Sequence, residues 1–363
     1  MTRLPAWIEY LLIPLMNLAL AFAVTAVIVI LVGESPIAAL TVLINGAFVY
    51  EGSLGYTLYY TTSFVFTGLA VAVAFHARLF NIGGEGQAYL GGLGALLVAL
   101  ALQDWLPGIL MIPLCILGAA AFGALWALIP GWLQAYRGSH IVITTIMFNF
   151  IGAGIMVGLL SGPLLRKGQS NPESELFADS ARMPQLHELL GNFGIEMGRS
   201  PLNLSIVVAA LASIGVWLLI WRTRWGYALR AMGESEPAAQ YAGVPVPRMV
   251  VTAMCISGAL AGLMAINTVM GDQGKVSLNF PAGFGFTGIA VALMGRSHPV
   301  GIVLAALLFG ALFQGGTELD FEFKTITREM VLLIQGLIIL FSGALSLMFV
   351  PWMERRFARR DPS

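Results

Sequence analysis

Residues 61–102 read TTSFVFTGLAVAVAF, HAR, LFNIGGEGQAY and LGGLGALLVALAL in succession. Two long apolar runs therefore flank a short polar interruption that contains three glycines between Asn81 and Gln87. An uncharged run of about 20 apolar residues is long enough to cross a bilayer as a helix. The stretch predicts two membrane helices joined by a polar, glycine-rich break.

The composition of the whole chain favours the same structural class. Of the 363 residues, 58% are hydrophobic and only 10% are charged, whereas a soluble domain carries roughly 25% charged residues. So little charge cannot cover a water-facing surface, which indicates an integral membrane protein of many spans. The formal net charge is zero, so no nucleic-acid partner is indicated. The four histidines lack the spacing of metal ligands, and we expect no metal site.

Ten apolar segments are candidate spans, and two of them, 87–103 and 284–295, are short for a bilayer. The first segment is too long for the core of a signal peptide, so we expect it to be an uncleaved first helix. We therefore expect an all-α polytopic membrane protein of about ten transmembrane helices, some of them short or broken. The segments are about 11–32, 56–77, 87–103, 108–129, 141–160, 202–221, 249–267, 284–295, 298–316 and 328–350.

The basic side chains orient these spans, because cytoplasmic loops carry an excess of lysine and arginine. With both termini inside, the inner side holds Arg3, Arg78, Arg137, Arg222, Arg224, Arg230, Arg248, Arg296, Arg355, Arg356, Arg359 and Arg360. The outer side holds Arg166, Lys167, Arg182, Arg199, Lys275, Lys324 and Arg328. We expect both termini in the cytoplasm and a single transmembrane domain over residues 1–363. Its longest outer loop is at about 161–201 and its main inner loop at about 222–248.

Motifs for ATP binding and for hydrolysis are missing from the sequence. The chain contains only the lysines Lys167, Lys275 and Lys324, and none completes the phosphate-binding pattern G-x-x-x-x-G-K-[ST]. Neither a nucleophile elbow nor an HExxH motif occurs. We expect a transport protein rather than an enzyme, with no cofactor bound by this chain.

One apolar stretch occurs twice. FVFTGLAVA at 64–72 returns as FGFTGIAVA at 284–292. Two explanations stay open, because apolar segments match easily by chance and because transporters commonly contain duplicated membrane units. In the expected topology both copies run inward from the outside, so a duplication would be parallel rather than inverted.

Polar residues within apolar segments are candidate functional positions, because burying them in lipid is costly. The candidates for a translocation path are Asn81, Glu85, Gln87, Thr145, Phe148 and Asn149. Two roles stay open for Glu85. Its carboxylate either pairs with Arg78 or caps a helix that begins near Gln87, or it contacts a substrate or a gate. The neighbouring glycines allow unusual backbone geometry, which a membrane tolerates only against protein or a wet cavity.

Three blocks of sequence carry a resemblance to a known family. They are LFNIGGEGQ at 79–87, ITTIMFNFIG at 143–152, and GYALRAMGESEPAAQYAGVPVPR at 226–248 followed by ISGALAGL at 256–263. Over about residues 56–345 the chain resembles the permease subunits of bacterial ABC importers. It looks most like the nucleoside-uptake branch of the group that also includes simple-sugar permeases.

The resemblance implies a translocation path for nucleosides across the cytoplasmic (inner) membrane of a bacterium. It implies a second, often non-identical permease subunit, a cytoplasmic ATPase that binds ATP and magnesium, and an extracytoplasmic substrate-binding protein. In the inner loop it implies a coupling helix that sits in a groove of the ATPase. The matching positions are Arg230, Gly233, Glu234, Ala238, Ala239 and Gly243. Phe148 is then either a ring that stacks on a nucleobase or a lipid-facing residue.

Three alternatives stay open beside a nucleoside permease. The first is a simple-sugar permease of the same architecture. The second is an ion-driven secondary transporter, which buried acidic pairs would favour, but only Glu85 is available. The third is a membrane scaffold without transport, which would not need the polar inner loop. A neighbouring gene for an ATPase and a binding lipoprotein separates the importers from the other two.

Overall fold

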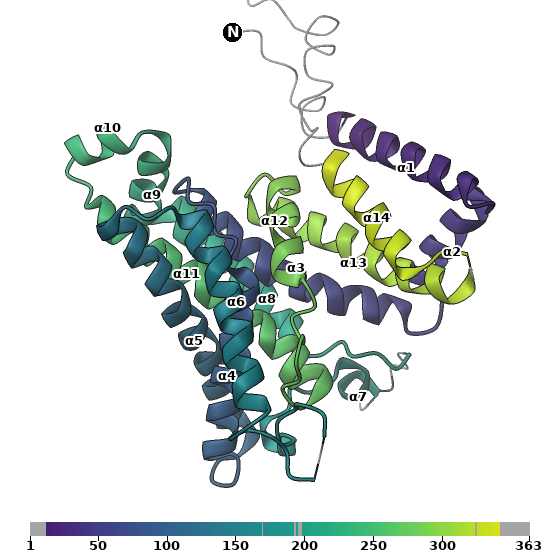
Figure 1. Ribbon diagram of the computed structural model, residues 1–363, viewed down its shortest axis with the longest axis horizontal. Coiled ribbons are helices and arrows are strands. Elements are labelled where there is room, and N and C mark those ends of the chain that lie inside the picture. The colour runs from purple at the N-terminus through teal and green to yellow at the C-terminus, as the bar shows by residue number, and fades with distance from the viewer. Residues whose placement is uncertain (1–11, 169, 192–193, 195–197, 324, 342–363) are drawn as a thin grey trace, which may run out of the picture. The chain divides into compact units, whose positions relative to one another are not determined.

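The computed structural model describes residues 12–341 except residues 169, 192–193, 195–197 and 324. Within these ranges the chain is helical apart from turns, loops and two isolated antiparallel bridges, Glu173 with Ser277 and Gln185 with Asn203. The chain divides into two compact units (Figure 1), unit 1 with Met1–Tyr50 and Ala311–Ser363 and unit 2 with Glu51–Gly310. The terminal arginines on which the expected orientation partly rests lie outside the described residues.

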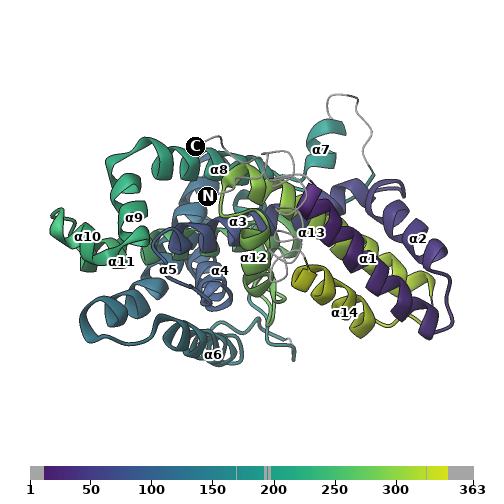
Figure 2. The same ribbon diagram turned by 90° about the horizontal axis from the view of Figure 1, so that it is seen from above.

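Unit 2 holds most of the helices. Its apolar helices are α3 (Ser53–Phe75), α4 (Gly84–Leu102), α5 (Gly108–Arg137), α6 (Ile141–Leu160), α8 (Ser205–Arg222), α11 (Val246–Ala265), the 11-residue α12 (Phe284–Met294) and the first part of α13 (Pro299–Glu322). Its short helices are η2 (Asp179–Ala181), α7 (Leu186–Gly191), α9 (Arg224–Glu234), α10 (Glu236–Tyr241) and the π-helix η3 (Ile266–Gln273). Helices α4, α5 and α11 run alongside one another, and α9 and α10 lie at one end of them (Figures 1 and 2).

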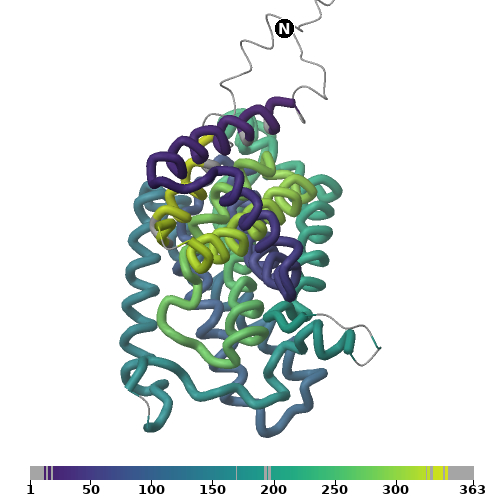
Figure 3. The backbone as a smooth tube through the Cα atoms, turned by 90° about the vertical axis from the view of Figure 1, so that its right-hand side faces the viewer, coloured from purple at the N-terminus to yellow at the C-terminus, as the bar shows by residue number. Residues whose placement is uncertain are grey.

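Unit 1 holds α1 (Ile13–Leu31), α2 (Pro36–Phe48), the later part of α13 and α14 (Arg328–Ile339). The chain bends by 118° between α1 and α2, as the purple segment of Figure 3 shows. Ser35 starts α2, because its Oγ accepts a hydrogen bond from the Ala38 amide at 3.4 Å and Pro36 follows at the first helical position. At 13 residues, α2 is shorter than a span, and it lies between the expected segments 11–32 and 56–77.

A helix overlaps each of the ten expected apolar segments. Among the described residues, seven helices are long and apolar enough to cross a membrane, namely α3, α4, α5, α6, α8, α11 with η3, and α13. If the bent pair α1–α2 is counted as one span, the number of candidate spans is eight. Helix α12 is apolar but shorter. For α14, residues beyond 341 lie outside the described part. The prediction of an all-helical, multi-span protein is confirmed, and the number ten stays a prediction.

Glycines allow α4, α5 and α11 to pack at close range. A Cβ atom at Gly91 would lie 2.4 Å from the Gly262 Cα, and one at Gly123 would lie 2.3 Å from the Gly258 carbonyl oxygen. No side chain fits at these contacts, so the backbones themselves meet. Small residues at helix crossings are the usual means of association in membranes, where apolar burial does not distinguish protein from lipid.

At the opposite end from α9 and α10, the π-helix η3 is tied down by one buried amide. The Asn267 Nδ2 donates to the Tyr59 carbonyl at 2.9 Å and to the Ser63 Oγ at 2.8 Å, both on α3. Its Oδ1 accepts from the Ser205 Oγ of α8 at 2.8 Å and from the Asn203 Nδ2 at 3.0 Å. Asn267 is fully buried. Burying its side-chain amide without hydrogen bonds would cost free energy, and these bonds remove that cost.

The two copies of the repeated stretch are both helical and lie in contact. The first is part of α3 and the second makes up most of α12. A Cβ atom at Gly288 of α12 would lie 2.5 Å from the Thr67 Cβ of α3. Each helix is preceded by a glycine in the left-handed region, Gly52 at φ 79° and Gly283 at φ 81°. Chance and duplication both remain open as the origin of the likeness.

The glycine crossing predicts a sharp difference between two alanine substitutions. A Cβ atom at Gly262 would lie 2.5 Å from the Ala119 carbonyl oxygen, and backbone must shift to make room. We expect Gly262→Ala to cost about 1–3 kcal/mol of stability, as overpacking does, and to lower the melting temperature in detergent. Gly215→Ala on α8 is the control, because nothing lies within 4 Å of its Cβ position. Equal melting temperatures for the two variants would contradict the packing argument.

Candidate functional site

The stretch that interrupts the apolar runs forms a true break between α3 and α4. Helix α3 ends at Phe75 and α4 begins at Gly84, so residues 76–83 are outside both helices. Arg78 turns the chain with a left-handed backbone at φ 55°. Glu85 lies in the first turn of α4, which confirms the prediction that a helix begins at this point. The break needs partners for its backbone N–H and C=O groups, because a membrane offers none.

The side chains of Asn81 and Gln87 bind each other across the break. The Asn81 Nδ2 donates to the Gln87 Oε1 at 3.0 Å, and the Gln87 Nε2 donates to the Asn81 Oδ1 at 3.1 Å. The same Asn81 oxygen accepts from the Gly83 amide at 2.9 Å, and the Asn81 Nδ2 also donates to the Ser257 Oγ of α11 at 2.8 Å. Ser257 in turn donates to the Ala70 carbonyl at 2.6 Å. The pair therefore joins α3, the break, α4 and α11.

Helix α6 supplies further partners for the break. The Asn149 Oδ1 accepts from the Gly86 amide at 2.8 Å, and its Nδ2 donates to the Ile82 carbonyl at 2.9 Å. The Ile82 amide donates to the Thr145 Oγ1 at 3.4 Å. A Cβ atom at Gly86 would lie 2.9 Å from the Asn149 Cα, so glycine is needed for α6 to come this close. We call the buried residues Asn81, Gln87, Thr145 and Asn149 the break clamp.

The Glu85 carboxylate binds neither Arg78 nor its own helix start. Its two oxygens accept from the Gly283 amide at 2.8 Å and from the Gly285 amide at 2.9 Å. These amides open α12, where free N–H groups and the helix dipole favour a negative charge. Arg78 instead faces Glu234, with 4.0 Å between Nη2 and Oε2. Glu85 therefore links the start of α4 to the start of α12. The link depends on Gly283, which lies 198 residues further along the chain.

Phe148 lies apart from this cluster of polar bonds. Its ring packs against Trp126 with centroids 5.1 Å apart, and its carbonyl accepts from the Trp126 Nε1 at 3.2 Å. The face of α6 that is exposed in this chain carries Met147 and Phe150 instead. Five of the six candidates for the translocation path thus meet at the break, and their contact with a substrate stays a prediction.

The break clamp predicts that Asn149 is needed for folding. Asn149→Leu would leave the Gly86 N–H and the Ile82 C=O without partners inside the membrane, and each such group costs about 1–3 kcal/mol. We expect a clear drop in melting temperature and in the monodisperse yield from detergent. Thr144→Val on the same helix is the control, because the Thr144 Oγ1 bonds only residues 139 and 140 at its own helix start. If the two variants behave alike, Asn149 does not hold the break.

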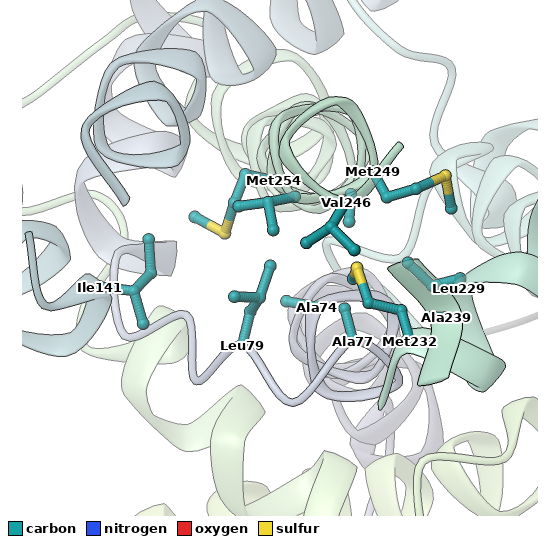
Figure 4. Close-up of a cluster of buried hydrophobic side chains, with 12 residues drawn as sticks. Ala74, Ala77, Leu79, Ile141, Leu229, Met232, Ala239, Val246, Met249 and Met254 are labelled. Carbon is teal, nitrogen blue, oxygen red and sulfur yellow. The ribbon is translucent and has the colours of Figure 1, made fainter. Parts of the chain in front are cut away.

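The inner loop folds as two short helices on an apolar base. Thr223 caps α9, since its Oγ1 accepts from the Gly226 amide at 3.0 Å. Leu229 and Met232 of α9 point into a buried cluster with the ends of α3 and α11 (Figure 4). A Cβ atom at Gly233 would lie 2.1 Å from the His76 carbonyl oxygen. The expected helix over this loop is present, in two pieces that meet at Ser235.

The six coupling candidates divide into buried and exposed positions. Gly233 and Ala239 are buried within this chain, with Ala239 only 3% exposed. Arg230 is half-buried, and the exposed positions are Glu234, Ala238 and Gly243. Sequence reasoning passed over Tyr241, which is 97% exposed at the end of α10. The available signal was an aromatic residue at the end of the stretch EPAAQY, which is otherwise made of polar residues, proline and alanine.

His76 links this base to the turn between α12 and α13. Its Nε2 lies 3.1 Å from the Ser297 carbonyl oxygen, and its ring stands edge-on to Trp221 with centroids 5.1 Å apart. Burial lowers the pKa of His76 from 6.5; the bond to Ser297 opposes this shift, while the charges of Arg230 and His298 add to it. The neutral ring with a proton on Nε2 fits the bond to Ser297.

This shift predicts a pH dependence of stability. Because the folded-state pKa lies below the unfolded value of 6.5, the unfolded chain takes up the proton first as the pH falls. The contribution of His76 is complete above pH 6.5 and is lost as the pH falls from there through the folded-state pKa. We expect His76→Gln, which keeps a donor for Ser297, to flatten the fall in melting temperature between about pH 7.5 and about pH 5.5. The exposed His140 provides the control, as His140→Gln should leave the wild-type slope.

Taken together, the described residues form a polytopic helical membrane protein of the transporter type, with a satisfied helix break within the bundle and a helical pair at one end. The family described as "branched-chain amino acid transport system / permease component" matches residues 53–343. The chain belongs to this family of ABC transporter permeases. It is therefore a transport component and not an enzyme.

Several characterised permeases are similar over most of their length. The guanosine ABC transporter permease protein NupP of Bacillus subtilis is 37% identical, over 92% of this chain and 93% of that protein. The nucleoside ABC transporter permease protein NupB of Lactococcus lactis is 33% identical, over 91% and 90%. The glucose ABC transporter permease protein TsgB13 of Haloferax volcanii is 32% identical, over 93% and 88%. The first two species each contribute a more distant permease, NupQ and NupC, both 28% identical over 70% of this chain. No solved structure matches the chain.

Proposed function

We propose that this chain is the permease subunit of an ABC importer that takes up nucleosides. The observation that carries the substrate class is the likeness to the guanosine permease NupP at 37% identity over nearly the full length of both chains. The glucose permease TsgB13 at 32% identity supports a second candidate, uptake of a simple sugar. The chain lies in the bacterial cytoplasmic membrane as a single transmembrane domain of about ten spans, with both termini inside.

In this proposal ATP and magnesium are held by a separate cytoplasmic ATPase, and an extracytoplasmic binding protein delivers the substrate. The ATPase docks on the exposed side of α9 and α10, at Glu234, Ala238, Tyr241 and Gly243. The buried Gly233 and Ala239 act indirectly, because they seat the two helices on the apolar base. Because Ala239 is buried, Ala239→Arg would disturb the packing of this chain itself, and a test of docking therefore needs an exposed position.

The second permease subunit is proposed to be non-identical. The pairs NupP with NupQ and NupB with NupC, each from one species, support two unlike permeases in one importer. The exposed face of α6 is suited to the pathway between them, since Met147 and Phe150 project from it and nothing lies within 4 Å of the Cβ positions of Gly154 and Gly158. Small residues at this spacing allow a helix or a flat ligand to approach the backbone.

A competition assay tests the substrate class. The permease, co-expressed with the ATPase, second permease and binding protein of its own operon in a host without nucleoside uptake, should accumulate radiolabelled guanosine or another nucleoside. Unlabelled nucleosides should compete, and ribose and glucose should not. Competition by a sugar together with no nucleoside accumulation would favour the sugar permease instead.

A second variant in the same cells tests the docking surface. Ala238→Arg places a long charged side chain on the exposed side of α10, where no packing of this chain is disturbed. We expect uptake to fall at least tenfold while the amount in the membrane and the melting temperature stay unchanged. Arg137→Gln at the end of α5, outside α9 and α10, should retain uptake. Normal uptake with Ala238→Arg would show that the ATPase docks elsewhere.

A further inference from the structure

Helix α12 begins beside the middle of α3 rather than beside one of its ends. The ring of Phe284, the first residue of α12, packs against the ring of Phe64 with centroids 5.2 Å apart. Phe64 lies halfway along the 23-residue α3, which is long and apolar enough to span a membrane. The start of α12 therefore lies near mid-depth. Residues 274–283 lead from η3 to this depth without helical structure (Figure 1).

This non-helical segment is held along the first half of α4. A Cβ atom at Gly92 of α4 would lie 2.5 Å from the Phe280 Cζ. The Tyr89 hydroxyl of α4 donates to the Asn279 Oδ1 at 3.0 Å. The end of the segment is held by the carboxylate at the start of α4, as described above. Because α4 is itself a candidate span, the segment lies at membrane depth and is not a loop beyond the helix ends.

One side of the segment and of the first turn of α12 is open. Asn279, Ala282 and Phe286 are exposed, whereas Phe280 and Phe284 between them are buried. The Phe286 side chain is 48% exposed. The Asn279 side chain accepts the Tyr89 hydrogen bond through its oxygen, and its Nδ2 donates to no residue that the structure describes. A ring and an amide donor are thus presented together at mid-depth.

Lipid is a poor environment for this open side. Within the described part of the chain, the backbone amides of Leu278 and Phe280 donate to no acceptor. Irregular backbone at membrane depth is tolerated only against protein or along a water-filled cavity. The free Nδ2 of Asn279 adds two further donors that lipid cannot satisfy. The open side therefore requires water, a polar solute or a second protein.

The position of the open side favours a path for a solute. Consecutive residues of α4 bind α12 and α6, because Glu85 accepts from the Gly283 amide and the Gly86 amide donates to Asn149. The open side therefore lies at the same depth as Phe150, on the face of α6 that we assign to the pathway. The chemistry also fits a nucleoside, since a flat base stacks on an aromatic ring and its ring nitrogens and carbonyls accept hydrogen bonds.

We propose that Asn279, Ala282 and Phe286 line the translocation path at mid-depth, with the Phe286 ring against the nucleobase and the Asn279 Nδ2 donating to an acceptor on the base. Ala282 lies between them and leaves room for the solute. The identity of the solute rests on the proposed function. The presence of a water-filled path along this segment does not depend on which solute is carried.

Thiol labelling of the complete importer tests whether the open side is wet. Asn279→Cys and Phe286→Cys are treated in membranes, with and without ATP, with a positively charged methanethiosulfonate reagent. This reagent attacks thiolates, which form in water and not in lipid, so both variants should react at least about tenfold faster than Leu211→Cys. Leu211 is 62% exposed on the apolar helix α8. The wild type gives the background of Cys115 and Cys255.

Uptake at saturating nucleoside tests the contact with the base. Phe286→Tyr keeps the ring and should keep the maximal rate, whereas Phe286→Leu keeps only apolar bulk and should lower the rate at least about fivefold. Asn279→Asp keeps an acceptor for the Tyr89 hydroxyl and tolerates the left-handed backbone at φ 59°, but it lacks the Nδ2 donor, so its rate should also fall. A merely structural role for these residues would lower the melting temperature, which we expect to stay unchanged.

The two measurements separate the path from the solute. Labelling of both cysteine variants no faster than Leu211→Cys would overturn the proposed path. Fast labelling of the permease alone but not of the complete importer would assign the open side to the second permease. Equal uptake by Phe286→Leu and Phe286→Tyr would overturn the contact with the base. Fast labelling in an importer that accumulates a sugar and no nucleoside would confirm the path and refute the proposed substrate class.

Discussion

The structure depends on one constraint, which is that every backbone amide and carbonyl at the break between α3 and α4 must find a partner without water. The Asn149 side chain meets this need from α6 with two bonds, to the Gly86 amide and the Ile82 carbonyl. Asn81 meets it from within the break. Because these partners come from several helices, the break cannot form unless the bundle around it has formed. The polar residues that interrupt the apolar pattern are therefore what makes an interrupted helix possible in a membrane.

The same principle explains why glycines gather around the break. Gly86 allows α6 to approach closely enough for Asn149 to reach the backbone, and Gly285 lies against the start of α4, where its amide binds Glu85. A side chain at either position would lengthen hydrogen bonds that the membrane cannot replace. Close packing and hydrogen bonding are thus two aspects of one requirement in this region.

In the inner loop, α9 and α10 have one buried side and one exposed side. Leu229, Met232 and Ala239 are buried in an apolar cluster with the ends of neighbouring helices, so the pair moves with the bundle. The opposite side presents Tyr241 and small residues such as Ala238, all of them exposed. A packed base and an exposed outer face suit the ATPase docking proposed above, because a displacement of this face would move the helices packed against it.

The sequence alone determined the helical membrane class, the position of the break, the start of a helix near Gln87 and the helical inner loop. Each of these follows from local properties, namely apolar run length, glycine and proline placement, and the absence of charge. Only the tertiary structure decided that Glu85 binds the start of α12, that Gly233 and Ala239 face inward, and that Tyr241 faces outward. These outcomes depend on which helices pack together, and the packed helices are separated by as many as about 200 residues of sequence. The 3.6-residue periodicity of a helix shows which residues share a face, but it does not show which of two small-residue faces packs against a neighbouring helix.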